Sequence, residues 1–190
     1  YDPSKERDAT PILEQVEGMA AAIKAGKIRA YGLSNETPFG LSEFTRVAKE
    51  AGLPPPASVQ NGYSLVNRLF DGDPAEASRM VNVPLLAYSP RAMGLLPGKM
   101  KTKPWPKDAR LEKFPDFGER YKRPRVLEAA AKYQQLAEKH GVPLAGIALA
   151  FVMKRFFVAS TIIGATSIKQ LEELSKYFEL NLSEGIKKEI

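Results

Sequence analysis

The 190-residue sequence contains no cysteine, so disulfide bonds, cysteine-ligated metal sites and a cysteine nucleophile are excluded. It also lacks any apolar run near the roughly 20 residues that a membrane-spanning helix needs. No basic flank followed by an apolar segment marks a signal peptide. We therefore expect an intracellular protein without membrane insertion, in the cytoplasm or in the stroma or matrix of an organelle.

The only histidine, His140, lies directly before Gly141 at the end of a predicted helix. There it interacts favourably with the helix dipole and follows no strand, so we assign it no catalytic role and expect no metal site. The composition is 44% hydrophobic and 26% charged, which is typical of a globular protein with one sizeable core. No linker divides the chain, so residues 1–190 are expected to form a single domain.

The net charge is +6, and much of the excess lies between Lys99 and Arg125, a stretch that also holds several prolines. We interpret this stretch as a long surface loop. Its aromatic residues lack the regular spacing of base-stacking side chains, so no nucleic-acid partner is expected. Two interpretations of Trp105 stay open: it forms a wall of the substrate pocket, or it packs against the side of the fold.

Helices and short apolar strands alternate along the chain. Proline and hydroxyl residues open the helices and glycines close several of them, which predicts helices at 10–26, 37–52, 124–140, 143–155 and 167–176, with further ones beginning at 73 and 183. Strands are predicted at 28–35, from 57 onward, at 83–89 and at 160–165. This alternation favours an α/β fold with a parallel sheet that is covered on both faces.

Each predicted strand changes from apolar to hydrogen-bonding residues at the same end. Ligands of parallel α/β folds bind at the carboxyl ends of the strands. In chain order the strands deliver there Ser34 and Asn35, then Gln60, Asn61 and Tyr63, then Tyr88 and Ser89, and finally Gly164 to Ser167. Four such changes in register predict one polar site over the mouth of a barrel or sheet.

These residue types suit a nucleotide cofactor. Ser, Asn and Gln side chains can hold a carboxamide, and Tyr88 offers a flat face on which a ring can stack. Gly94 and Gly98 let backbone N–H groups approach phosphates. The helix that begins near Ser167 presents its positive end to an anion, with Lys169 beside it. No GxGxxG motif follows a strand, so a Rossmann-type site is not expected.

Four segments, in chain order, carry a resemblance to a known family: GKIRAYGLSNET, VQNGYSLVNR, LLAYSPRAMGLLPGK and STIIGATSIKQLEEL. They closely resemble the aldo-keto reductases, in the branch of the bacterial Tas-like reductases and the potassium-channel beta subunits. The resemblance implies an α/β fold that is the C-terminal half of a TIM (β/α)8 barrel, with about four parallel strands and flanking helices. It also implies that NADP(H) binds at the mouth and that complete members reduce small aldehydes and ketones.

The resemblance implies three groups of cofactor contacts. The nicotinamide carboxamide corresponds to Ser34, Asn35 and Gln60, and the ring that stacks on the nicotinamide corresponds to Tyr88. The loop that crosses the pyrophosphate holds Ser89, Arg91 and Gly94. The region of the 2′-phosphate and adenine holds Ser167, Lys169, Gln170 and Glu173, and Gly164 at the end of the last strand is included with the cofactor-binding residues. Family members often carry Leu where Arg91 stands, and usually an adenine-contacting Asn where Leu174 stands.

The family's catalytic Asp, Tyr, Lys and His come from the first half of the barrel, so we assign no catalytic residue to this chain and expect it to be inactive alone. Half a barrel leaves two sheet edges unpaired and apolar inner side chains exposed. The domain is therefore expected to be incomplete at its N-terminus, with the other half on the same chain, on another chain or in a second copy. Two hypotheses follow: a carbonyl-reducing enzyme, or a non-catalytic barrel-derived subunit of a larger assembly.

Overall fold

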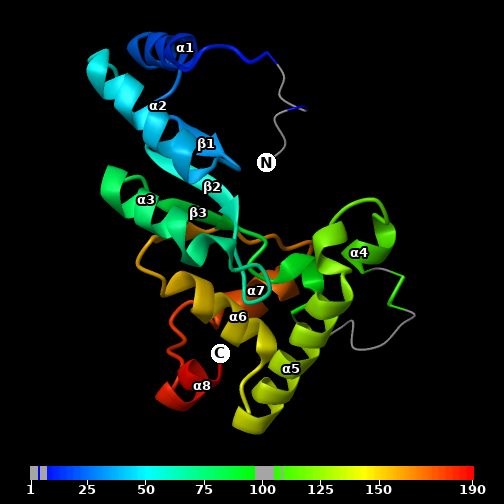
Figure 1. Cartoon of the computed structure of the whole chain (residues 1–190). Coiled ribbons are helices and arrows are strands. Elements are labelled where there is room, and N and C mark those ends of the chain that lie inside the picture. Colours follow the sequence, from blue (N-terminus) through cyan, green and yellow to red (C-terminus); the bar gives the residue numbers. More distant parts are fainter. Residues whose placement is uncertain (1–3, 5–7, 97–104, 108) are drawn as a thin grey trace.

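The computed structural model describes residues 4, 8–96, 105–107 and 109–190 (Figure 1). Four strands form one sheet in the order β1 (Gly32–Ser34), β2 (Ser58–Gly62), β3 (Leu85–Tyr88) and β4 (Val158–Thr161). Each neighbouring pair is parallel. The predicted α/β fold is confirmed, and within the described ranges β1 and β4 are edge strands, as expected for part of a TIM barrel.

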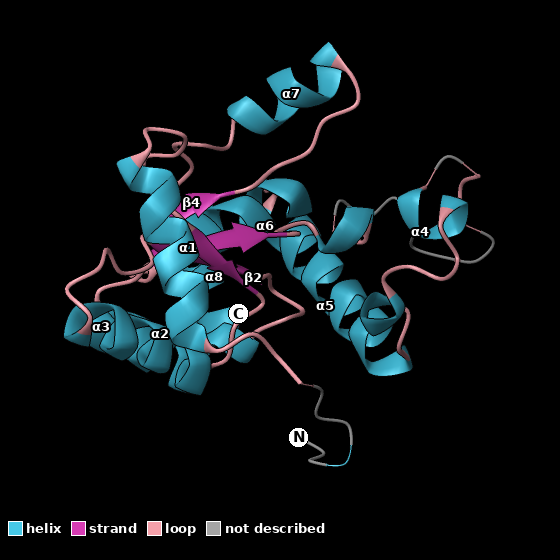
Figure 2. Ribbon diagram, turned by 90° about the horizontal axis from the view of Figure 1, so that it is seen from above, coloured by secondary structure: helices cyan, strands magenta, loops and turns pink. Residues whose placement is uncertain are grey.

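Helices flank the sheet, and short helical turns occur in the chain between its second and third strands and between its third and fourth strands (Figures 1 and 2). The longer helices are α1 (Ile12–Lys24), α2 (Pro38–Glu50), α3 (Asp73–Val81), α5 (Pro124–His140), α6 (Leu144–Met153), α7 (Ile168–Ser175) and α8 (Glu184–Glu189). The short elements are η2 (Leu69–Asp71), η3 (Ala92–Gly94), α4 (Arg110–Lys113) and η4 (Glu119–Tyr121). In Figure 1, α1 and α2 lie beside β1 at one end of the molecule, and α5 and α8 lie at the other.

The helix boundaries follow the capping signals in the sequence. Thr37 accepts a hydrogen bond from the backbone N–H of Gly40 at the start of α2 (3.0 Å), and Ser167 and Ser183 cap α7 and α8 in the same way. At the other end of α5, Gly141 adopts a left-handed φ of 63°. The predicted helices are therefore confirmed at most of their ends.

The fourth strand was predicted at 160–165 but lies at 158–161. Its last bond to the sheet runs from the N–H of Ile162 to the carbonyl of Ala87 (2.8 Å). Because β3 ends at Tyr88, the apolar residues beyond Ile162 have no strand to pair with. Residues 162–167 instead form the connection to α7 (Figure 2).

The two faces of the sheet differ in polarity. One register row packs into the core and consists of Leu33, Val59, Leu85 and Val158. Its two central members are buried, and Leu33 and Val158 on the outer strands are partly buried. The next row points to the opposite face and consists of Ser34, Gln60, Leu86 and Ser160. We expected apolar inner side chains to be exposed on this face. In this row the exposed members are polar and Leu86 is half-buried, whereas Ile162, two residues after Ser160, is 38% exposed, so the expectation holds only at the end of β4.

The stretch between Lys99 and Arg125 was interpreted as a surface loop, and most residues of its described part are indeed exposed. It is not a loop throughout, because it contains α4 and η4. Trp105, Leu111 and Tyr121 are all buried in the main core. A Cβ on Gly118 would lie 2.7 Å from the Sδ of Met93, so this segment packs closely on η3. Of the two interpretations of Trp105, the structure favours packing against the fold, because its side chain is only 6% exposed.

Helix α6 is the most deeply buried helix, with every residue from Leu144 to Val152 buried. A Cβ on Gly146 would lie 2.8 Å from Cδ1 of Tyr177 and 3.0 Å from Cδ2 of Leu180, so the chain after α7 runs directly across α6. Among the described residues no single helix is long and apolar enough to cross a bilayer. Helices α5 and α6 reach that composition only together, and they meet at 103°.

Candidate functional site

The carboxyl ends of β1, β2 and β3 bring four predicted site residues together. The register places Ser34 beside Gln60 and Gly62 beside Tyr88. The hydroxyl of Tyr88 donates to Oδ1 of Asn35 (2.7 Å), and Nδ2 of Asn35 donates to Oγ of Ser34 (3.2 Å). Side chains from the first and third strands are thus joined across the end of the second.

These side chains keep hydrogen-bonding capacity toward solvent. Ser34, Asn35 and Gln60 are exposed, and no bond joins the amide of Gln60 to the side chains that the structure describes. The Asn35 amide keeps one donor hydrogen and one acceptor lone pair beyond its two bonds. The edge therefore offers both donors and acceptors, as a carboxamide ligand requires.

The ring of Tyr88 stands against the end of β2. A Cβ on Gly62 would lie 3.1 Å from Cε2 of Tyr88 and 3.0 Å from Nδ2 of Asn67. That Asn67 amide donates to the Gly62 carbonyl (3.2 Å). Only a residue without a side chain fits between the ring and the amide at their present positions, so Gly62 determines where the Tyr88 ring lies.

The loop after β3 has an unusual backbone. Ser89, Ala92 and Met93 have φ of 54°, 47° and 57°, and Gly94 has 98°. Left-handed φ costs about 1–2 kcal/mol for a non-glycine residue and occurs where the surrounding structure imposes it, often at functional sites. The predicted pyrophosphate loop is therefore held in one defined path. Gly98, also predicted to contact phosphate, lies outside the described residues.

Arg91 lies in this loop and is half-buried. Its Nε is buried and makes no hydrogen bond with the described residues. Burial lowers the pKa of Arg91, and the nearby Glu173 and Tyr177 oppose that change. Because Glu173 belongs to α7, the charge of Arg91 couples the β3 loop electrostatically to the helix that carries the remaining predicted residues.

The start of α7 holds the other predicted cofactor contacts. Ser167 accepts a hydrogen bond from the N–H of Gln170 (3.2 Å). Oε1 of Gln170 accepts bonds from the N–H (2.9 Å) and the hydroxyl (3.1 Å) of Thr166. Gln170 is thus part of the helix cap, whereas Gly164, Lys169 and Glu173 are exposed. Leu174, the position at which the resemblance implied an adenine-contacting Asn in family members, is 1% exposed and packs inward.

Tyr63 was predicted at the mouth, and the structure places it in the core. Its ring stacks on Phe151 with centroids 5.6 Å apart, and its hydroxyl donates to Asp71. Burial and the bond to Asp71 raise the pKa of Tyr63. His140 lies at the end of α5, as predicted, where Nε2 pairs with Glu189 of α8 (2.9 Å).

Two residues of this region were missed by the sequence analysis. Asn67 donates to the Gly62 carbonyl and, like the Tyr88 ring, lies close to where a Cβ on Gly62 would be. Tyr121, from the segment interpreted as a surface loop, is 2% exposed, and its buried hydroxyl makes no hydrogen bond with the described residues. Asn67 belongs to the segment VQNGYSLVNR that carries the family resemblance, whereas no motif in the sequence points to Tyr121.

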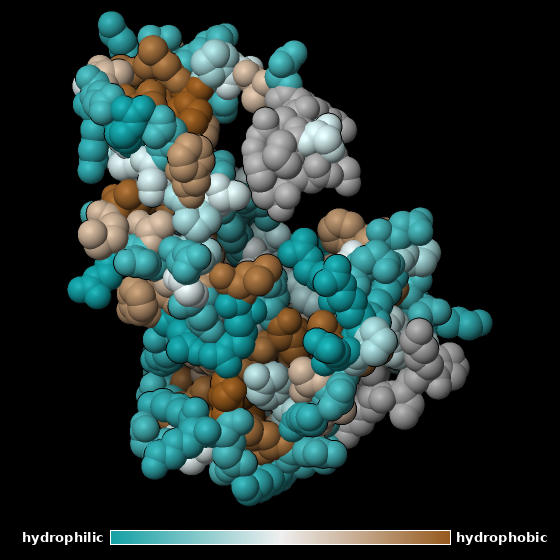
Figure 3. All heavy atoms as spheres, viewed as in Figure 1, coloured by the Kyte–Doolittle hydropathy of each residue, from teal (hydrophilic) through white to brown (hydrophobic). Residues whose placement is uncertain are grey.

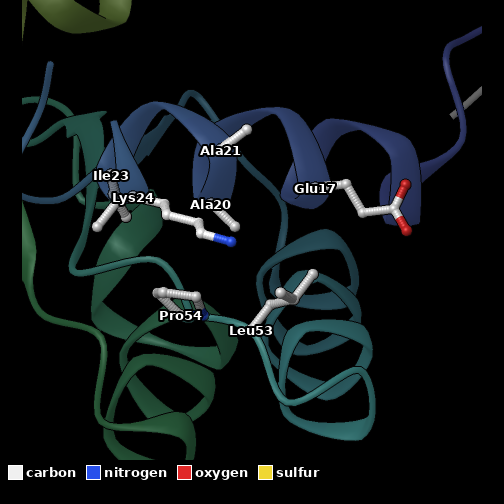
Figure 4. A pocket seen from close by; sticks show the side chains of 7 residues that line it. All are labelled: Glu17, Ala20, Ala21, Ile23, Lys24, Leu53 and Pro54. Carbon is white, nitrogen blue, oxygen red and sulfur yellow. The ribbon is translucent and has the colours of Figure 1, made fainter. Parts of the chain in front are cut away.

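A separate pocket with a volume of ≈ 370 Å³ lies between α1 and the connection from α2 to β2 (Figure 4). Its walls include Lys24 at the end of α1, and Leu53 and Pro54 before β2. It therefore lies at the amino ends of the strands, where ligands of parallel α/β folds do not usually bind. Within the described ranges no cluster of His, Asp or Glu is arranged to hold a metal ion.

Comparison with known proteins gives a consistent result along the chain. A model of the aldo/keto reductase family matches residues 3–190. "Protein tas" of Escherichia coli (strain K12) is 40% identical over 190 residues, which are 100% of this chain and 55% of that protein. "Aldo-keto reductase" of Babesia bovis is 37% identical over 174 residues, or 88% of this chain and 61% of the relative.

A more distant relative is the "NADH-specific methylglyoxal reductase" of Escherichia coli (strain K12). It is 27% identical over 176 residues, or 93% of this chain and 52% of the relative. The chain thus spans about half the length of the curated relatives it matches.

The contacts of Gly62 predict the effect of adding one methyl group. We expect Gly62→Ala to lower the free energy of unfolding by about 1–3 kcal/mol, because the Tyr88 ring and the Asn67 amide must move apart. Denaturant unfolding of the native polypeptide measures this loss. Gly18→Ala is the matched control, since a Cβ there meets nothing within 4 Å and α1 gains helix propensity. Equal effects of the two substitutions would contradict the close packing at Gly62.

Proposed function

Since the chain belongs to the aldo/keto reductase family, we propose that it forms the cofactor-binding half of an NADP(H)-dependent oxidoreductase that reduces small aldehydes and ketones. The observation that carries the proposal is the hydrogen-bonded row from Tyr88 through Asn35 to Ser34. This row lies beside the exposed amide of Gln60 at the carboxyl ends of three parallel strands.

The residues present fit the parts of a nicotinamide dinucleotide. Ser34, Asn35 and Gln60 match a carboxamide, which both donates and accepts hydrogen bonds. Tyr88 supplies the aromatic face for the nicotinamide ring. The left-handed loop from Ser89 to Gly94 and the half-buried guanidinium of Arg91 suit the pyrophosphate. The orphaned Nε of Arg91 supports this assignment, because a buried unpaired donor calls for a partner.

The phosphate at the far end of the cofactor determines the choice between NADP(H) and NAD(H). We assign it to the start of α7, where Ser167, Lys169 and Gln170 surround a helix N-terminus. Lys169 is exposed and supplies a charge for a 2′-phosphate, which supports NADP(H). One relative is named as an NADH-specific reductase, so this specificity is the first property to test.

The cofactor, when bound, supplies the hydride that reduces the carbonyl carbon. The residues of this chain bind and orient it, and we assign none of them the proton transfer. A general acid works best with a pKa near the operating pH. Tyr63 does not meet this requirement, because burial and Asp71 raise its pKa. We propose that the proton donor lies in the part of the protein that completes the barrel.

The domain formed by residues 1–190 is proposed to be incomplete at its N-terminus. The helix before the first strand and the helix after the last strand both expose apolar side chains. On α1, Leu13 and Met19 are 45% and 42% exposed. On α7, Ile168 and Leu171 are 77% and 50% exposed. Figure 3 shows hydrophobic residues gathered over the α1 end of the molecule. Further strands beside β1 and β4 would cover these faces and pair both sheet edges.

The central test is binding of NADPH to the native polypeptide, followed by the emission of the reduced nicotinamide. We expect Tyr88→Ala to weaken binding about three- to tenfold, because a stacked aromatic pair contributes roughly 0.5–1.5 kcal/mol. Tyr31→Ala is the control, since the Tyr31 hydroxyl donates to Pro54 near the amino ends of the strands. A protein that binds neither NADPH nor NADH refutes the proposal. Binding without turnover of any aldehyde favours the non-catalytic subunit.

Lys169→Ala tests the coenzyme preference. Removing this ammonium should weaken NADPH binding about ten- to a hundredfold and leave NADH binding unchanged, because a charged hydrogen bond contributes roughly 1.5–3 kcal/mol and each 1.4 kcal/mol is a factor of about ten. Titrations with the two coenzymes measure the ratio of their dissociation constants. Lys176→Ala, just beyond the last turn of the same helix, controls for the general loss of positive charge. An unchanged ratio in Lys169→Ala places the 2′-phosphate elsewhere.

The mass of the intact native polypeptide tests the incomplete domain. A barrel of this class has about 250 residues or more, so we expect further residues before Tyr1. Mass spectrometry of the protein from its source organism, without proteolysis, gives this value directly. A native mass equal to that of the 190-residue chain contradicts the expectation and leaves a separate partner or a second copy to complete the barrel.

A further inference from the structure

Asn61 follows Gln60 in β2 and is half-buried, and the proposed cofactor contacts do not include it. Its side-chain amide makes two hydrogen bonds to the backbone of one residue in the loop that follows β1. Oδ1 of Asn61 accepts from the N–H of Glu36 (3.2 Å), and Nδ2 of Asn61 donates to the carbonyl of Glu36 (3.0 Å). Because one amide binds both backbone groups of Glu36, it fixes the orientation of that residue as well as its distance from β2.

This amide continues the pairing of β1 and β2 beyond their last backbone bond. The backbone pairing ends where the N–H of Asn35 donates to the carbonyl of Gln60 (2.9 Å). At the following residue, Glu36, the Asn61 amide satisfies both the N–H and the carbonyl, as a neighbouring strand would. The chain is therefore held to β2 on both sides of Asn35.

Asn35 depends on such support because its backbone is left-handed, with a φ of 54°. Asparagine visits this conformation more readily than most residues, but the conformation is still unfavourable without local hydrogen bonds. In this turn the Asn35 side chain accepts a hydrogen bond from the Tyr88 hydroxyl (2.7 Å) and donates to Oγ of Ser34 (3.2 Å). The direction of the Asn35 amide thus depends on a turn that Asn61 fixes from the far side.

The start of α2 is held by other contacts. The hydroxyl of Thr37 accepts from the N–H of Gly40 (3.0 Å), and Oε1 of Glu36 accepts from the N–H of Thr37 (2.8 Å). Neither bond involves Asn61. Loss of the Asn61 amide should therefore free the turn at Asn35 and leave the helix capped.

We propose that Asn61 is a positioning residue: its amide fixes Glu36 against β2 and thereby keeps Asn35 in the left-handed turn that directs the Asn35 amide toward the nicotinamide carboxamide. This inference rests on the proposed function and adds to it a residue that acts through Asn35 rather than on the cofactor. It also assigns a role to the polar residue at the end of β2 that the carboxamide contacts leave unused.

The test compares NADPH binding by the native polypeptide and its Asn61→Ala variant, which removes both bonds to Glu36. We expect the dissociation constant to rise about three- to tenfold and the blue shift of bound NADPH emission to shrink, because the Asn35 amide is no longer held in place. Asn82→Ala is the matched control. Asn82 is also left-handed, with a φ of 58°, but it ends α3 at the amino end of β3. This control should lower the melting temperature without changing NADPH binding or emission.

A double variant separates positioning from a merely structural role. Asn35→Gly removes the amide that Asn61 is inferred to direct, and glycine accepts the same φ without strain. Adding Asn61→Ala to Asn35→Gly should therefore cause no further loss of NADPH binding, although it still lowers the melting temperature. Full additivity of the two effects on binding overturns the inference.

Asn61→Asp serves if Asn61→Ala does not fold. It keeps an acceptor for the N–H of Glu36 and loses the donor to the Glu36 carbonyl, so its dissociation constant for NADPH should also rise. A native polypeptide that binds neither NADPH nor NADH refutes the proposed function and this inference together. If the native polypeptide binds NADPH and the Asn61 variants bind it equally well with unchanged emission, the inference alone is refuted.

Discussion

The parallel register of β1, β2 and β3 is the constraint on which the site depends. Parallel strands end at one edge, so the polar residue after each apolar strand lies beside its counterparts. The bond from Tyr88 to Asn35 spans the width of β2 because the register aligns Ser34 with Gln60 and Gly62 with Tyr88. A slip of one residue in either pairing would turn these side chains to the opposite face. The buried row through Val59 and Leu85 opposes such a slip, since it would expose that row to water.

The close approach at Gly62 and the left-handed turn at Ser89 act together. The first sets the distance between the Tyr88 ring and β2, and the second turns the chain away from the sheet. The packing of Met93 against Gly118 then holds η3 from the side of the η4 segment. Elements far apart in sequence therefore define the end of one strand, and the geometry of the mouth depends on the core beneath it.

The sequence predicted most of the fold because local signals and tertiary structure agree. Thr37, Ser167 and Ser183 cap the helices where capping residues were identified, and the polar strand ends meet as the parallel rule requires. The end of β4 was not predictable from its own residues, because β3 ends at Tyr88 and leaves Ile163 unpaired. Tyr63 directly follows β2, as a residue at the mouth of the sheet would, but its ring packs against Phe151 and Phe157 in the core. The spacing of Trp105, Leu111 and Tyr121 matches neither a helical nor a strand period, so no pattern in the sequence indicates that these residues are buried.

The two ends of the candidate site are attached to the core in different ways. The Tyr88 end lies on a sheet whose outer strand β1 has only three residues and one unpaired edge among the described residues. The α7 end continues into Tyr177 and Leu180, which lie across Gly146 of the fully enclosed helix α6. Leu174 is the one buried residue of α7 itself, so the α7 end is attached to the core through that leucine and the turn that follows the helix. A molecule bound across both ends would therefore connect this turn mechanically to the outer strand of the sheet.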